Sequence, residues 1–139
     1  MDFYQVPRCC YPAILLGESY TAQDGSIIPN NRLTKPGRIP RRYAYCSDTE
    51  YFPNLIEQVR GVDLLYHEAT FGEDLRARLA TTAHSTAREA ATIALKAEVK
   101  RLLIGHYSSR YTDVTPLLDE ARSVFPNTTA AQEGLIIHL

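Results

Sequence analysis

The sequence has no run of about 18 apolar residues, which is the length that a helix needs to cross a bilayer. Its first residues, Met1 to Tyr4, do not form a basic and apolar leader, so we expect no secretory signal. Cysteine is scarce: Cys9, Cys10 and Cys46 are an odd number without CxxC spacing, which is typical of a reducing cytoplasm and not of a disulfide scaffold. These features predict a cytoplasmic protein with no membrane span.

An excess of one charge is also lacking. The 139 residues include 15 Lys and Arg and 16 Asp and Glu, which gives a net charge of -1. This balance excludes a global basic field, so a nucleic-acid partner would have to be held by a local patch. A basic run over residues 32–42 fits a solvated loop and a phosphate-facing loop equally well; it consists of Arg32, Lys35, Arg38, Arg41 and Arg42.

The chain divides near residue 42. Five of the 8 prolines and three of the 7 glycines lie in residues 1–42, so this segment should form turns and short strands but no helix. Asp24 and Gly25, between residues 19–21 and 26–28, indicate a hairpin.

Residues 43–139 alternate between strand and helix patterns, which predicts an α/β architecture. Thr86 and Glu89 form a capping box at the start of the strongest helix, and Thr115 should cap a helix that has Pro116 at its first position. The pattern predicts a buried strand at 43–46, further strands at 62–66, 101–105 and 135–138, and helices at 52–60, from 86 and at 115–124.

Acids and imidazoles follow three of these strands. Asp48 follows the first strand, His67 and Glu68 the second and His106 the third, while His84 precedes the strongest helix. The carboxyl edge of an open α/β sheet is where ligands bind, so three of the four histidines should collect at one edge. Each residue also has an ordinary interpretation: Asp48 as a helix cap, His67 as strand-end polarity and His84 as a surface residue.

These residue types suit metal-assisted hydrolysis. A carboxylate can bridge two divalent metals and a neutral imidazole is a good zinc ligand. Two metals roughly 3.5–4 Å apart activate water and stabilise the oxygens at phosphorus, and a separate histidine oriented by a carboxylate can protonate the leaving oxygen. The chain offers fewer than four convincing ligands, so spacing alone does not establish a metal site.

Taken in order, four strings resemble ribonuclease Z, the tRNA 3′-processing nuclease of the metallo-β-lactamase class. HEAT and HST together are specific to that family, and the register holds over residues 40–134. The strings are YCSDT at 45–49, HEATF at 67–71, HSTA at 84–87 and GHYSSRY at 105–111, followed by FPNT at 125–128.

The resemblance implies roles for single residues. Asp48 matches the aspartate that bridges two zinc ions, and His106 matches a terminal ligand of one of them. His84 matches the proton donor at the scissile phosphate, and Glu68 matches its carboxylate partner. Beside His106, the residues expected to support substrate binding are Ser108 and Arg110.

The chain departs from the family pattern in lacking any HxH string. The family's HxHxDH string and a further histidine supply most of the metal ligands, so the resemblance implies the C-terminal half of a metallo-β-lactamase-type αββα sandwich with part of the site. In the complete protein it implies a zinc-dependent endoribonuclease that removes the 3′ trailer of precursor tRNA, and a homodimer. The alternative is a non-catalytic folding or interaction module of the same family.

Overall fold

The computed structural model describes residues 4–37, 39–78 and 82–139. The chain forms two compact units, Met1–Pro40 and Arg41–Leu139. Within the described ranges no helix is long and apolar enough to cross a membrane.

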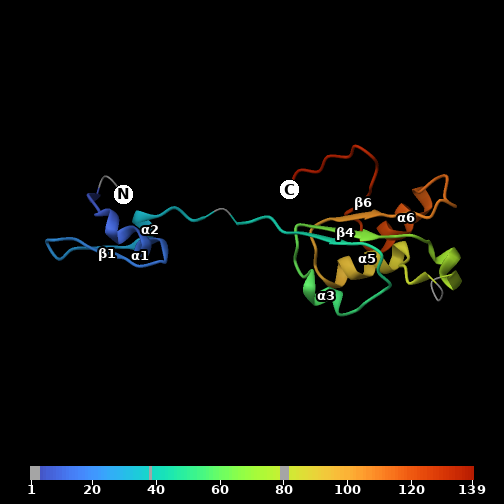
Figure 1. The fold of residues 1–139 in the computed structure, drawn as a ribbon, viewed down its shortest axis with the longest axis horizontal. Coiled ribbons are helices and arrows are strands. Elements are labelled where there is room, and N and C mark those ends of the chain that lie inside the picture. The colour runs from blue at the N-terminus through green and yellow to red at the C-terminus, as the bar shows by residue number, and fades with distance from the viewer. Residues whose placement is uncertain (1–3, 38, 79–81) are drawn as a thin grey trace. The chain divides into compact units, whose positions relative to one another are not determined.

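The first unit is built from short elements (Figure 1). Its small apolar core contains Val6, Ile14 and Leu33. Two short strands pair antiparallel on either side of Asp24 and Gly25. The Asp24 carboxylate accepts a hydrogen bond from the Ser26 amide at 2.9 Å, which closes the turn. The elements are η2 (Arg8–Cys10), α1 (Tyr11–Leu15), β1 (Tyr20–Thr21), β2 (Ile27–Ile28) and α2 (Asn30–Leu33).

The expectation that this segment contains no helix was wrong. Pro12 lies in the first turn of α1, and Pro29 is the N-cap of α2. Proline is tolerated at these positions because an amide there would have no partner within the helix. The prolines therefore begin short helices here and do not exclude them.

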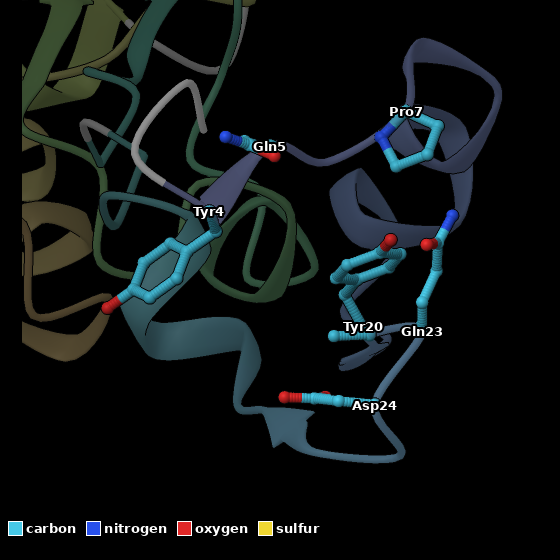
Figure 2. A pocket seen from close by; sticks show the side chains of 7 residues that line it. Tyr4, Gln5, Pro7, Tyr20, Gln23 and Asp24 are labelled. Atoms are coloured by element: carbon cyan, nitrogen blue, oxygen red, sulfur yellow. The ribbon is translucent and has the colours of Figure 1, made fainter.

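A cavity of about 290 Å³ lies within the first unit. Figure 2 shows its lining, which includes Tyr4, Tyr20 and Asp24. The lining contains no histidine, cysteine or lysine, and its one carboxylate is already bonded to Ser26.

The second unit is a four-stranded parallel sheet in the order β3-β4-β5-β6, with helices in the connections (Figure 1). The strands are β3 (Tyr43–Cys46), β4 (Leu64–Glu68), β5 (Leu102–Gly105) and β6 (Thr128–Ala130). The connections carry α3 (Leu55–Gln58), η3 (Glu73–Arg78) with α5 (Ala87–Lys96), and α6 (Thr115–Val124). The predicted α/β class is confirmed.

The main core lies between the sheet and the helices. Leu65, Leu102 and Ile104 are buried against the alanine-rich face of α5 and against α6. Alanine allows close approach of the helix and has the highest helix propensity. The expected capping box is present, since Thr86 accepts from the Glu89 amide and Glu89 from the Thr86 amide. α5 is thus held firmly at the end that follows His84.

Three predicted details were wrong. The strand at 43–46 is not buried: β3 is an edge strand, and Tyr43 and Tyr45 are more than half exposed. Residues 135–138 form no strand, and the fourth strand is the shorter β6, whose polar threonines hide it from an apolar pattern. Thr115 is the first helical residue and not the cap; the Asp113 carboxylate accepts its amide at 2.9 Å.

Tyr45 and Tyr66 stack with ring centroids 4.5 Å apart and an interplanar angle of 11°. The Tyr66 ring lies across Gly105, where an added Cβ would be 2.5 Å from the Tyr66 hydroxyl oxygen. Because Gly105 has no side chain, the Tyr66 ring can lie against the backbone at the residue before His106.

Asp63 joins three strands at the amino end of the sheet. Its carboxylate accepts from the Arg42 amide at 2.8 Å and from Lys100 Nζ at 2.7 Å, and it lies 3.4 Å from Arg41. These partners, Lys100 first, lower the pKa of Asp63 to about 2. Arg42 also donates to the Gly61 carbonyl at 2.6 Å. Two members of the basic run thus stabilise the sheet, while Arg38 lies outside the described residues.

We predict that Asp63 contributes stability that depends on pH. Because folding lowers its pKa from 3.8 to about 2, the contribution is complete above the unfolded value and is lost as the pH falls toward 2. The urea midpoint of the wild-type chain should therefore fall more steeply between pH 5 and 2 than that of Asp63→Asn. The exposed Asp119→Asn is the matched control, and parallel curves for wild type and Asp63→Asn would contradict the prediction.

Candidate functional site

The candidate site lies where the parallel strands end. Glu68 is the last residue of β4, Asp48 follows β3 by two residues, and His106 directly follows β5. His84 precedes Thr86, the N-cap of α5. Parallel strands place their carboxyl ends at one edge of a sheet, so these four positions converge.

Asp48, His84 and His106 form a cluster at this edge. Each offers one ligand atom, and these atoms lie within 4.8 Å of one another. His106 Nε2 is 3.4 Å from Asp48 Oδ1, and the two imidazole centroids are 5.2 Å apart. A carboxylate and imidazoles suit zinc, and Asp48 and His106 are open to solvent. The donor set therefore fits zinc, although three donors are one fewer than a closed tetrahedral site needs.

The backbone is left-handed at three places in or beside this cluster. Asp48 has φ 50°, Ala83 has φ 50° and His106 has φ 59°. Only five non-glycine residues of the described ranges have a positive φ, and alanine has no polar side chain to offset the crowding. Because such strain gathers at functional sites, the backbone supports the same location as the side chains.

Glu68 is fully buried beneath the cluster, and its carboxylate accepts hydrogen bonds from several segments. His84 Nδ1 lies 3.0 and 3.1 Å from its two oxygens. The other donors are the Thr49 amide at 2.6 Å, the Thr70 hydroxyl at 2.6 Å and the Ser85 amide at 3.2 Å. One carboxylate thus joins the loop after β3, the end of β4 and the approach to α5.

These hydrogen bonds keep Glu68 ionised. Burial raises its pKa, but the bonds from Thr70, His84, Ser85 and Thr49 outweigh burial, so the pKa of Glu68 lies below its usual range. The buried anion therefore lies within hydrogen-bonding distance of the His84 ring.

One further contact holds His84 and a second holds its neighbour Ser85. The Phe71 ring meets it edge-on, with centroids 6.3 Å apart. The Ser85 hydroxyl donates to the Thr49 carbonyl at 2.7 Å, which ties the HST string to the loop that carries Asp48. The ring has only 24% of its surface exposed, so its position is well defined.

His67 does not belong to the site, contrary to the expectation that it would gather with the other two histidines. It is fully buried, its Nδ1 lies 2.8 Å from the Glu68 carbonyl oxygen, and its Nε2 has no hydrogen-bond partner in the described part of the chain. Burial lowers the pKa of His67. Neighbours on a strand point to opposite faces, so the side chains of His67 and Glu68 diverge.

The turn after His106 carries the other two predicted residues. The Ser108 amide donates to the Thr70 carbonyl at 3.1 Å, and the Ser108 hydroxyl accepts from the Arg110 amide at 3.4 Å. The Arg110 side chain is exposed. Sequence reasoning missed Thr70, whose hydroxyl lies 2.6 Å from Glu68 and 3.1 Å from His106 Nδ1; the signal was its place in the HEAT string.

The parallel sheet and the cluster at its carboxyl edge define a class of protein. Residues 28–107 match the family described as "Beta-lactamase superfamily domain", and the chain belongs to that superfamily. The solved metallo-beta-lactamase fold protein YhfI from Bacillus subtilis is similar, with a TM-score of 0.60 and 28% identity over 66% of this chain and 37% of YhfI.

Within this superfamily the chain resembles ribonuclease Z, as its motifs predicted. It is 60% identical over 138 residues to ribonuclease Z of Porphyromonas gingivalis and 54% identical over 139 residues to that of Phocaeicola vulgatus. These matches cover 99% and 100% of this chain but 45% of each relative. The chain therefore spans less than half the length of the curated relatives it matches.

We predict that the 139-residue chain binds zinc weakly or not at all, because Asp48 and His106 offer two ligands, and even with His84 the three donors of the cluster do not complete a four-coordinate site. Calorimetric zinc titration should give a low affinity that falls further in His106→Ala. His138→Ala is the matched control, since this exposed histidine lies outside the cluster. Stoichiometric zinc retained through dialysis against a chelator would contradict the prediction.

Proposed function

We propose that this chain supplies part of the active site of a zinc-dependent phosphodiesterase that removes the 3′ trailer of precursor tRNA. The observation that carries the proposal is the pairing of His84 with the buried Glu68 beside Asp48 and His106. This pairing supports a proton-donating role for His84 next to a candidate metal site. The ribonuclease Z relatives support tRNA as the substrate class.

Asp48 and His106 would hold metal. Asp48 is the exposed carboxylate of the cluster, and its two oxygens allow it to bridge two ions. When bound, a zinc pair activates a water molecule and stabilises charge on the oxygens at phosphorus. Further ligands are expected from the part of the family sequence that lies outside this chain.

His84 would give a proton to the leaving oxygen of the scissile phosphodiester. Its Nδ1 faces Glu68, which leaves Nε2 as the nitrogen that can serve the cluster. Glu68 orients the ring and stabilises its charged form before the proton leaves. Both roles need a carboxylate that is ionised and immobile, as Glu68 is.

Arg110 and Ser108 would contact the substrate. Arg110 is exposed in the turn after His106, and a guanidinium pairs well with phosphate.

We place this activity in a cytoplasmic homodimer. The three free thiols, Cys9, Cys10 and Cys46, fit a reducing compartment.

A non-catalytic module is the second candidate function. It is favoured by the candidate metal cluster, which offers three donors within the described residues. In that case the chain would fold and associate without hydrolysing RNA. Mutation of the Glu68–His84 pair decides between the two roles. If the chain forms part of an active site, these mutations slow cleavage, and if its role is non-catalytic, they have no effect on cleavage.

We predict that His84→Ala, made in a polypeptide of full family length that carries this chain, slows cleavage of precursor tRNA by roughly 10²–10⁴-fold, the usual contribution of general acid catalysis. Glu68→Gln should act in the same direction. The double mutant should lose far less than the product of the two losses, since paired groups act as a unit. Single-turnover cleavage measures the rates, and His138→Ala should match wild type.

Zinc content separates the roles. His84→Ala should retain its zinc, while Asp48→Ala should lose zinc and activity together, because it removes a proposed bridging ligand. If His84→Ala releases zinc, His84 is a ligand and not the proton donor. If the two losses multiply, His84 and Glu68 do not work as a pair. If a zinc-loaded wild-type protein fails to cleave precursor tRNA, the non-catalytic role stands.

A further inference from the structure

The Thr70 hydroxyl fills the space between Glu68 and His106. Its Oγ1 lies 2.6 Å from Glu68 Oε2, 3.1 Å from His106 Nδ1 and 2.9 Å from the His106 carbonyl oxygen. Glu68 Oε2 and His106 Nδ1 are 4.0 Å apart, which is too far for a direct hydrogen bond. Thr70 is therefore the group that links them.

The protons in this link can be assigned. A threonine hydroxyl has one proton to donate and can accept two hydrogen bonds. The ionised Glu68 and the His106 carbonyl can only accept, and the bond to Glu68 is shorter and involves a charge. Of the three neighbours only His106 Nδ1 can donate to Oγ1. The chain of hydrogen bonds thus runs from His106 Nδ1–H to Thr70 and from Thr70 O–H to Glu68.

We propose that Thr70 is a positioning residue that fixes the tautomer of His106, so that Nδ1 carries the proton and the Nε2 lone pair faces the cluster. This rests on the proposed function in that His106 is taken as a metal ligand. In the competing tautomer Nε2 would carry the proton and point it at Asp48 Oδ1, 3.4 Å away. A protonated Nε2 cannot bind metal, so the tautomer decides whether His106 is a ligand.

The link also makes Glu68 common to both histidines. It accepts directly from His84 Nδ1 and, through Thr70, from His106 Nδ1. In each ring Nδ1 faces the buried carboxylate and Nε2 is left for the cluster. Groups behind metal ligands commonly fix tautomer and ring orientation in this way.

The backbone holds Thr70 still. The Ala69 amide donates to the Gly105 carbonyl at 2.8 Å, which continues the pairing of β4 with β5, and the Ser108 amide donates to the Thr70 carbonyl at 3.1 Å. Thr70 is 6% exposed. The position of the Thr70 hydroxyl is therefore set by the fold. Valine has nearly the same shape as threonine but no hydroxyl, so it can replace Thr70 in the test.

Ring ¹⁵N NMR of His106 in the metal-free 139-residue chain at pH 8, where imidazoles are ordinarily neutral, tests the proposal. In wild type and in Thr70→Ser, Nδ1 of His106 should be protonated and Nε2 unprotonated. Thr70→Val should move population to the opposite tautomer. The His84 ring, which contacts Glu68 directly, should keep its Nδ1 proton in all three chains, and unchanged backbone amide shifts of α6 report an intact fold.

Zinc affinity gives a second measurement. Thr70→Val should bind zinc roughly 10–100-fold more weakly, the usual effect of losing a group behind a ligand, and Thr70→Ser should restore the wild-type value. If Thr70→Val does not fold, Thr70→Ala is the second hydroxyl-free variant. An unchanged His106 tautomer in a folded variant without the hydroxyl overturns the proposal.

The two proposals can fail separately. The tautomer is measured without RNA, so a full-length protein that does not cleave precursor tRNA would overturn the proposed function and leave the role of Thr70 standing. Normal cleavage together with an unchanged tautomer in Thr70→Val would overturn the role of Thr70 alone.

Discussion

The geometry of this site depends on one buried carboxylate. Glu68 ends the strand β4 and accepts hydrogen bonds from the segments that follow β3 and precede α5. Through Thr70 it also reaches the residue that follows β5. Hydrogen bonds to the Glu68 carboxylate thereby hold three separate turns of the chain in place. The parallel sheet brings their ends close together, and Glu68 sets their positions relative to one another.

A buried charge of this kind is tolerated only because it is fully bonded. An unpaired carboxylate in the interior would cost several kcal/mol, but the donors around Glu68 outweigh burial and lower its pKa. The dependence is mutual, since the amides of Thr49 and Ser85 point at Glu68. Each would cost about 1–3 kcal/mol if left buried without an acceptor. Stability and site geometry are therefore coupled in the same group.

The sequence predicted those features of the fold that depend on residues close together in the chain. The Thr86 capping box and the strand–helix alternation needed only short windows of sequence. The pairing of Glu68 with His84 came from the HEAT and HST strings, and the structure places the two in contact. His67 was misplaced because its neighbour faces the site while its own side chain faces the core. Thr70 lies in the HEAT string, but the string alone did not indicate its role, because that role depends on a contact 36 residues along the chain.

The two ends of the sheet use charge in opposite ways. At the amino end, the Asp63 carboxylate is paired with Lys100 and Arg41 and accepts a hydrogen bond from the Arg42 amide, so its charge stabilises the fold. At the carboxyl end, the buried Glu68 takes the donors, which leaves the exposed Asp48 without a strong cationic partner beyond the 3.4 Å contact to His106 within the described residues. An exposed carboxylate beside two oriented imidazoles is suited to a cation that the protein itself does not provide. Charged groups therefore stabilise the fold at the amino end of the sheet, while at its carboxyl end a carboxylate and an imidazole are open to solvent.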